Sequence, residues 1–186
     1  MAALCAATAQ AGPASPASPA FVERYRLEQH GGGLGVEVDE SVVFLVREVP
    51  DKGPQWVVER QRRDRNWCGR KSADGQCVAT DVTVHDWASS SARTCAFLYV
   101  YMAGFADFRQ TARDQPPVIV TDSPLITLAF APSAAAGKPP PVLSEYVGPL
   151  ALWWREMENG LKPCWTTTPP VIDGVTLETR LAKPTS

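Results

Sequence analysis

Hydrophobic residues recur at every second position in the first half of the chain, which is the period of a β-strand. Within residues 36–49, Val42, Phe44 and Val46 follow this period, and the positions between them are also largely apolar. A strand with apolar residues on both sides is one that neighbouring elements cover on both faces. We therefore expect a central, doubly covered strand here.

Short turns join this central strand to its neighbours. The pattern predicts a preceding strand at 21–29 and a following strand at 55–63. Glycines at 31–33 and a Pro-Asp-Lys-Gly-Pro run at 50–54 supply the two turns. Strands joined by such short connections pair antiparallel, so we expect an antiparallel meander as the core sheet.

The period then changes to that of a helix. Cys95, Leu98, Met102 and Phe105 are three or four residues apart, and the serines at 89–91 offer side-chain oxygens for an N-cap. This pattern predicts a first helix that ends near residue 108. Prolines that follow it prevent its continuation.

A second helical stripe lies closer to the C-terminus. Six apolar residues between Leu143 and Leu161 are spaced by three and four. Pro149 fits a helix only in its first turn, so the helix should begin near Gly148 and end at Asn159-Gly160. Together the elements predict an α+β fold in which an antiparallel β-sheet packs against two main α-helices.

Three shorter segments complete this expectation. Residues 118–121 and 125–130 have the apolar, β-branched composition of short strands, and a turn at Asp122-Ser123-Pro124 separates them. Residues 174–182 predict a last strand at an edge of the sheet.

The N-terminus indicates export. Residues 1–11 resemble the end of a secretory signal peptide, in which Ala9-Gln10-Ala11 forms a small-residue cleavage site. Residues 12–20 predict a disordered Ala/Pro/Ser linker, and 21–186 a single domain. Two alternatives for the first segment are a disordered tail on a cytosolic protein and a lipid anchor at Cys5. The Ala- and Pro-rich spacers are typical of an exported bacterial protein.

Removal of a signal peptide leaves four cysteines, an even set that suits two disulfides in an oxidising compartment. Cys68 and Cys77 flank a polar loop, while Cys95 and Cys164 lie at helix ends that antiparallel packing brings together. We expect the bridges Cys68–Cys77 and Cys95–Cys164. A zinc site is the alternative, but the chain lacks the paired Cys-x-x-Cys or His spacing of such sites.

Composition narrows the classes of partner. The formal charge of -2 argues against a nucleic-acid-binding protein, and no apolar run reaches the ~20 residues of a membrane helix. The glycines at 31–35 complete neither a P-loop nor a dinucleotide-binding pattern. We expect no cofactor, no metal, no nucleic acid and no transmembrane segment.

One short segment contains the residue types of a hydrolase. His85 and Asp86 precede Ser89 by a few positions, as candidates for a Ser-His-Asp constellation. A triad requires convergent geometry, and no Gly-x-Ser-x-Gly elbow presents a serine here. The alternative is a surface histidine followed by helix-capping serines.

Basic residues gather in another segment. Residues 59–71 hold six basic side chains against two acidic ones, a net charge of +4. Guanidinium groups beside a tryptophan can hold a carboxylate, a phosphate or an acidic glycan. The alternative is an ordinary solvated strand and loop. The candidates for anion or partner binding are Arg60, Arg62, Arg63, Arg65, Trp67 and Arg70.

Two functions are compatible with these patterns. The favoured one is an exported, periplasmic or secreted module that binds or has a structural role without catalysis. Its partner would be an envelope protein or an anionic ligand. The alternative is a small hydrolase that uses His85 and Asp86 with a nearby serine.

Overall fold

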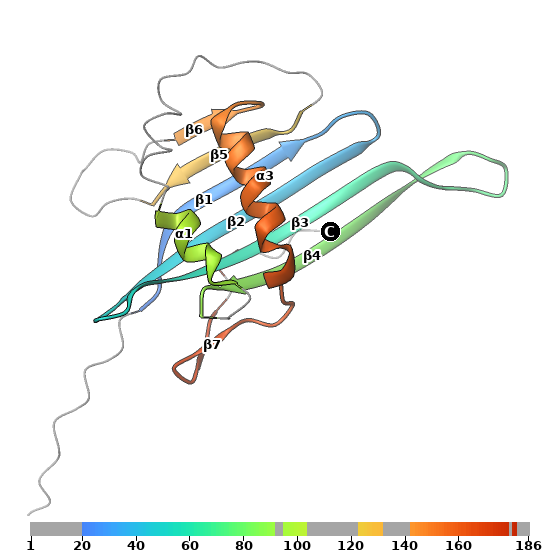
Figure 1. The fold of residues 1–186 in the computed structure, drawn as a ribbon. Helices are drawn as coiled ribbons and strands as arrows, with labels where there is room; N and C mark the ends of the chain where they lie inside the picture. The colour runs from blue at the N-terminus through green and yellow to red at the C-terminus, as the bar shows by residue number, and fades with distance from the viewer. Residues whose placement is uncertain (1–19, 92–94, 104–122, 132–141, 179, 182–186) are drawn as a thin grey trace, which may run out of the picture.

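The computed structural model describes residues 20–91, 95–103, 123–131, 142–178 and 180–181. Its centre is a six-stranded antiparallel β-sheet in the order β4-β3-β2-β1-β5-β6 (Figure 1). The strands of this sheet are β1 (Val22–Gly31), β2 (Val36–Val49), β3 (Gly53–Lys71), β4 (Cys77–Ser89), β5 (Leu125–Phe130) and β6 (Val142–Glu145). A separate hairpin consists of β7 (Val171–Ile172) and β8 (Val175–Thr176).

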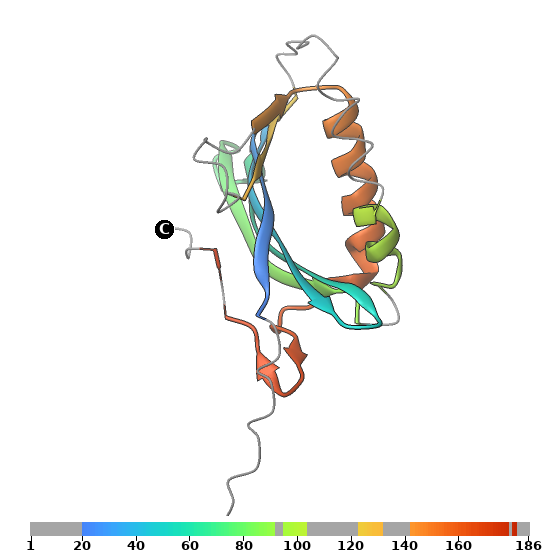
Figure 2. The ribbon, with the colours of Figure 1, turned by 90° about the vertical axis from the view of Figure 1, so that its left-hand side faces the viewer.

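Helices cover one face of the sheet. Helix α3 (Pro149–Leu161) crosses this face with α1 (Phe97–Ala103) beside it, and the 3-10 helix η2 (Lys162–Cys164) follows α3 (Figures 1 and 2). The chain after η2 passes to the opposite face. We call the two faces the helix-side face and the tail-side face. Among the described residues, no helix has the length and apolar character needed to cross a membrane.

The sheet has an apolar core on each face. On the helix-side face, strand residues such as Val42, Phe44 and Val58 pack against Leu150, Trp154, Met157 and Leu161 of α3. On the tail-side face, the core consists of Phe21, Val43, Leu45, Val57, Trp87, Ile172 and Leu181. Strand β2 is thus buried on both faces, and its bounds are those that the period-two pattern predicts.

The expectation of two main α-helices is wrong. The molecule is mainly antiparallel β-sheet. In the described part of the chain the one long helix is α3, with 13 residues, whereas α1 has seven. The serines that we expected to cap a long first helix instead end β4. The Ser90 amide donates to the Trp56 carbonyl at 2.9 Å, and the Ser90 hydroxyl accepts from the Trp56 amide at 2.9 Å.

The apolar stripe of the expected first helix does face the core. Cys95, Leu98 and Met102 are all buried, and among the described residues of this stretch the α-helix is Phe97–Ala103. Phe105, the expected strand at 118–121 and the segment 1–19 lie outside the described residues. Strand β5 has the bounds expected for 125–130, and α3 begins after Gly148 as expected. At the C-terminus, strand β8 has two residues, fewer than the 174–182 pattern predicted.

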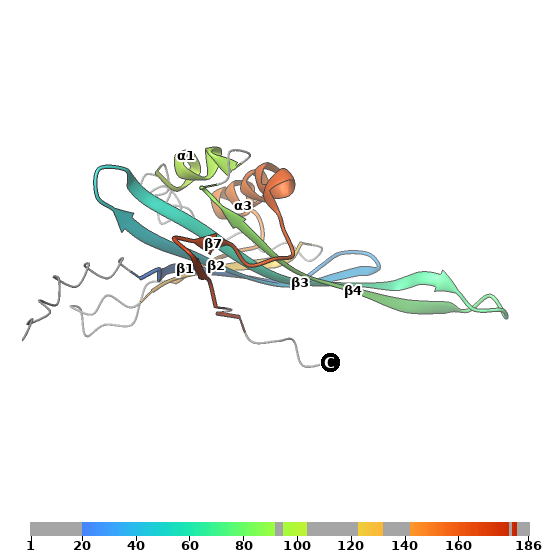
Figure 3. The same ribbon diagram turned by 90° about the horizontal axis from the view of Figure 1, so that it is seen from below.

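Strands β3 and β4 extend beyond the rest of the sheet as a two-stranded ribbon. Strand β2 begins opposite Asn66, and past that point β3 pairs only with β4. We call this ribbon, residues 66–80, the arm; Figures 1 and 3 show it projecting away from α3. The sequence predicted a strand only at 55–63 and a loop at the position of the arm.

Two disulfides join the cysteines in the pairing expected from the sequence. Cys68–Cys77 joins the two strands of the arm with a Cα–Cα distance of 4.6 Å. Cys95–Cys164 ties the residues just before α1 to η2, with a Cα–Cα distance of 5.5 Å. The first bridge therefore closes an exposed ribbon, and the second fixes both helical segments at one end of the core.

Candidate functional site

The residues considered for a hydrolase lie on one strand but point in different directions. His85 and Asp86 are adjacent in β4, so their side chains lie on opposite faces of the sheet. On the tail-side face, His85 Nε2 is 2.9 Å from Glu59 Oε1. On the helix-side face, Asp86 Oδ2 accepts a hydrogen bond from Arg60 Nη2 at 2.5 Å.

Ser89 is also remote from His85. Ser89 follows His85 by four positions along β4, which corresponds to about 13 Å. The Ser89 hydroxyl is 2.7 Å from the Ser91 hydroxyl, so the two serines share a hydrogen bond. The structure does not bring His85, Asp86 and Ser89 together.

The basic segment of β3 divides between the two faces because successive strand residues point to opposite sides. Arg60 and Arg62 lie on the helix-side face. Arg62 Nη1 is 2.5 Å from Glu158 Oε1 of α3, and its Nε is 2.8 Å from Asp64 Oδ1. Both guanidinium groups are therefore matched by carboxylates of the same chain.

A fully buried acid completes this cluster. Glu40 of β2 has no exposed surface, and its Oε1 lies 3.8 Å from Arg60 Nη1 and 3.7 Å from Arg62 Nη1. Its Oε2 accepts a hydrogen bond from the Trp154 indole at 3.2 Å. Burial, and secondarily the negative charge of Glu158, raise the pKa of Glu40 from 4.5 to about 7.

The cluster joins α3 to the sheet and leaves little room for an external anion. The ring of Trp165 lies 4.2 Å from the Arg60 guanidinium carbon, and Arg60 itself is mostly buried. Arg60 and Arg62, two of the residues predicted to bind an anion, thus have acidic partners inside the fold. Sequence reasoning missed Glu40, although Glu40 falls on the same period-two phase as Val42.

Arg63 and Arg65 alternate with Arg62 along β3 and lie on the tail-side face. Arg63 Nη2 is 3.6 Å from Asp39, and Arg65 Nε is 3.8 Å from Asp81. The Arg65 guanidinium also stacks 4.2 Å from the ring of Trp67. These pairs are partly exposed, so each stabilises the fold only weakly.

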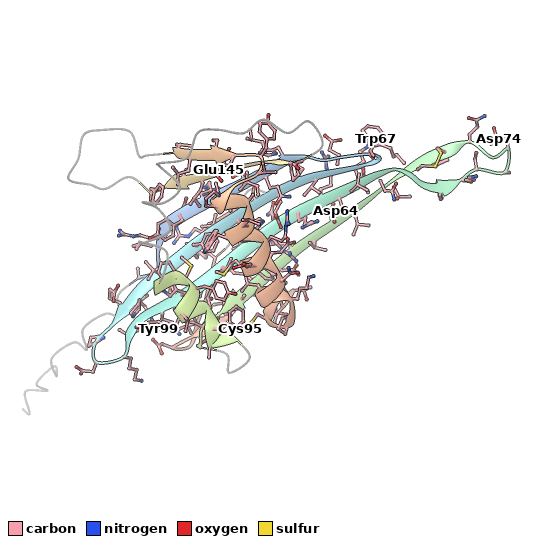
Figure 4. The ribbon with its side chains drawn as sticks, turned by 45° about the horizontal axis from the view of Figure 1, so that its top comes forward. Asp64, Trp67, Asp74, Cys95, Tyr99 and Glu145 are labelled. Carbon is pink, nitrogen blue, oxygen red and sulfur yellow. A yellow bond between two sulfur atoms is a disulfide. The ribbon has the colours of Figure 1, made fainter. Side chains whose placement is uncertain are left out.

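Trp67 stands at the base of the arm, where Figure 4 labels it. Half of its surface is exposed, and its amide donates to the Gly35 carbonyl at 2.9 Å. A hollow of about 310 Å³ lies between Trp67 and the β1–β2 turn. Leu34, 99% exposed, and Val36, 42% exposed, line the same hollow. We call Leu34, Arg65 and Trp67 the arm-base surface.

In the arm beyond this surface, the two strands pack closely at one point, and the β3 strand carries basic side chains. A Cβ at Gly69 would lie 1.8 Å from Thr80 Oγ1, so any other residue there would force the Thr80 side chain to move. Arg70 and Lys71 are exposed, and neither has an acidic partner in the part of the chain that the structure describes. At the tip, a hydrogen bond from the Ser72 hydroxyl lowers the pKa of the exposed Asp74 carboxyl.

Within the described ranges, no three His, Cys, Asp or Glu side chains are grouped so as to hold a metal ion. Comparison of the chain with protein-family models, curated proteins and solved structures gave no match. The function of this protein therefore has to be inferred from the geometry of the two faces of the sheet and of the arm.

Proposed function

We propose that this protein is an exported, non-catalytic binding module that contacts a protein of the cell envelope through the arm-base surface. One observation carries the proposal. Trp67, with 50% of its surface exposed, stands at the base of a disulfide-closed ribbon that projects beyond the core. Tryptophan is enriched among the residues that dominate protein–protein binding energy.

The arm is poorly explained as a stabilising element. Residues 66–71 are exposed, and the ribbon has no apolar core of its own. A two-stranded hairpin alone is marginally stable in water. The Cys68–Cys77 bridge and the antiparallel pairing of β3 with β4 hold the ribbon in place instead. Such construction maintains an extended shape outside the core, which a binding element requires.

Charge and apolarity together indicate the chemistry of the partner. Arg65, Arg70 and Lys71 are basic, and the β3 strand of the arm carries no acidic residue between residues 65 and 71. Leu34 and Trp67 supply adjacent apolar area. The matching surface is an apolar socket with an acidic rim, since complementary charge favours encounter and orientation.

The two disulfides are compatible with the export that the proposal assumes. Disulfides persist in oxidising compartments such as the periplasm and the extracellular space, and this fold contains two of them. The signal-like segment at residues 1–11 points to the same compartments. An envelope protein is therefore the class of partner that this module would meet.

Site-specific photo-cross-linking in the producing cells tests the proposal. A photoreactive phenylalanine derivative replaces Trp67 in one variant and Leu152, 56% exposed on α3, in a matched control. We expect a discrete adduct with one envelope protein from position 67 and none from position 152. The adduct should disappear when Arg70→Glu and Lys71→Glu are added.

Three results would contradict the proposal: no adduct at position 67, the same adduct at both positions, or an adduct that is insensitive to the charge reversals. Circular dichroism of each variant checks that the fold is retained. Because the reversals lie on the exposed arm, we expect them to leave the core intact.

A further inference from the structure

A second hollow lies at the end of β3 opposite to the arm. It has a volume of about 450 Å³ and is formed by the β2–β3 turn, the serines after β4, α1 and the β7–β8 turn. Figure 4 shows Tyr99, one of its lining residues, at the far end of the molecule from Trp67. A hollow of this size accommodates a small organic ligand.

A buried cation forms part of its wall. Arg47 lies on the tail-side face, and its side chain is only 8% exposed. Its Nη1 is 2.7 Å from Asp173 Oδ2, and its Nη2 donates to Gln55 Oε1 at 2.6 Å. Its Nε is buried and has no acceptor among the described residues. A buried guanidinium is costly unless carboxylates or other acceptors compensate it.

Asp173, which supplies the carboxylate, is weakly held. Its side chain is 59% exposed, and it lies in the Asp173-Gly174 turn between two strands of two residues each. A hairpin this short has little stability of its own. The Asp173 carboxylate therefore shows how a carboxylate binds Arg47. Because Asp173 is weakly held, the carboxylate of a ligand can take its place.

The rest of the lining favours a hydroxylated ligand with one flat face. Tyr99 is 47% exposed and lines the hollow, so its ring is a candidate surface on which a sugar ring can stack. Ser91 and Gln55 offer hydrogen-bonding groups, and Lys52 adds an exposed second cation. Arginine pairs with carboxylates in a planar, two-pronged geometry.

We propose that this hollow binds an acidic monosaccharide unit, of the hexuronate type, whose carboxylate replaces that of Asp173 on Arg47. Its ring stacks on Tyr99, and its hydroxyls bond to Ser91 and Gln55. The site does not depend on the arm-base surface, because Trp67 follows Gly53 by 14 positions along β3, a span of about 46 Å. Each proposal therefore stands or fails separately.

If the ligand's carboxylate must displace that of Asp173, removal of the Asp173 carboxylate should tighten ligand binding. Asp173→Asn removes the competitor, and asparagine tolerates the positive φ of 53° at this position. Glucuronate is titrated into the labelled protein, and amide shifts of Lys52, Gly53 and Ser91 are followed by NMR. We expect millimolar binding to the unchanged protein and several-fold tighter binding to Asp173→Asn.

Further probes and variants define the chemistry. Glucose, which lacks the carboxylate, and acetate, which lacks the ring, should each bind at least tenfold more weakly than glucuronate. Lys52→Ala, at an exposed position, should weaken glucuronate binding several-fold, and Arg47→Lys, which keeps the charge but loses the planar fork, at least tenfold. Arg63→Gln, a partly exposed arginine elsewhere, should leave the affinity unchanged.

The proposal is overturned if glucuronate produces no shifts at about 100 mM, a concentration well above a millimolar Kd, or if Asp173→Asn binds no more tightly than the unchanged protein. Equal binding of inorganic phosphate would overturn the carboxylate assignment, and equal binding of acetate would overturn the sugar. If Arg47→Lys fails to fold, Lys52→Ala takes its place, and unchanged glucuronate binding by Lys52→Ala would then count against the proposal.

Discussion

The indole of Trp154 donates a hydrogen bond to Glu40 Oε2 at 3.2 Å, in the interior between α3 and the centre of the sheet. The same indole N–H lies 3.1 Å from Gln29 Oε1, so it is shared between two acceptors. The main helix is thus joined to β1 and β2 by a polar contact inside an otherwise apolar interface. Stability should depend on the protonation of Glu40.

Changing Glu40 to Gln should remove a pH dependence of folding. The folded-state pKa of about 7 exceeds the ordinary value of 4.5, so the folded state binds a proton more tightly than the unfolded state. The stability that this proton confers is complete below pH 4.5 and is lost as the pH rises through 7. Its size is about 3 kcal/mol, since each pKa unit is worth about 1.4 kcal/mol.

Urea unfolding at a series of pH values measures this effect. We expect E40Q to be more stable than the unchanged protein at pH 9 and similar to it at pH 4. E48Q, at an exposed position, is the matched control and should retain the original pH profile. Identical slopes for E40Q and the unchanged protein between pH 5 and 8 would contradict the assignment.

Replacing Cys95 and Cys164 by alanine should destabilise the whole domain. The bridge closes a loop with a sequence separation of 69 residues. In the chain-entropy model a loop of that length is worth about 4 kcal/mol. Equilibrium unfolding by denaturant should show a loss of this order, with a single cooperative transition. A loss below about 1 kcal/mol would show that the bridge does not constrain the core.

Replacing Cys68 and Cys77 by alanine should have a local effect instead. The bridge spans nine residues and lies on the arm, away from both apolar cores. We expect hydrogen exchange of amides in residues 66–80 to accelerate strongly, while the amides of β2 stay protected. If protection in β2 falls equally, the arm is part of the cooperative core and its description as a separate ribbon is wrong.

Glu59 should be a structural residue whose truncation releases the C-terminal segment. It is fully buried, and its oxygens accept the Arg180 amide at 2.8 Å and the Leu181 amide at 3.4 Å. We expect E59A to lose about 2–4 kcal/mol and to become sensitive to proteolysis after residue 177. E59Q, which keeps one acceptor, should lose less.

The matched control is E178A, at an exposed position of the same segment. It should match the unchanged protein in both stability and proteolysis. Equal protease sensitivity of E59A and the unchanged protein would mean that Glu59 does not hold the segment.

Periodicity in the sequence predicts the parts of this fold in which burial determines structure. Strand β2 and helix α3 each bury a regular stripe, and both have nearly the expected bounds. The stripe predicted for the first helix is buried as expected, but within the described residues the helix covers Phe97–Ala103 alone. Ser90, which resembled a cap, pairs with Trp56 at the end of β4.

The arm was missed for the opposite reason. Its residues bury almost nothing, so no hydrophobic pattern marks them as strands. Hydrogen bonds between β3 and β4, together with Cys68–Cys77, hold the arm in place of burial. The composition of such a segment is that of a loop, and only the cysteine pair indicated that its ends lie close together.

The buried polar residues were also missed, although their positions in the pattern identify them. Glu40 continues the phase of Val42, and Arg47 continues the phase of Val43 and Leu45. A charged residue in phase with a buried stripe must find a partner inside the fold. The partners, Trp154 and Asp173, come from distant segments, so the sequence does not identify them.

Trp67 should be the residue through which the arm-base surface binds its partner protein. The most direct measurement is the affinity of the cross-linked partner, once purified, for W67A and for the matched variant L152A. We predict that W67A weakens binding by at least about 2 kcal/mol, roughly thirtyfold, and that L152A stays within about twofold of the unchanged protein. Equal affinities for W67A and the unchanged protein would mean that the arm-base surface does not bind the partner through Trp67.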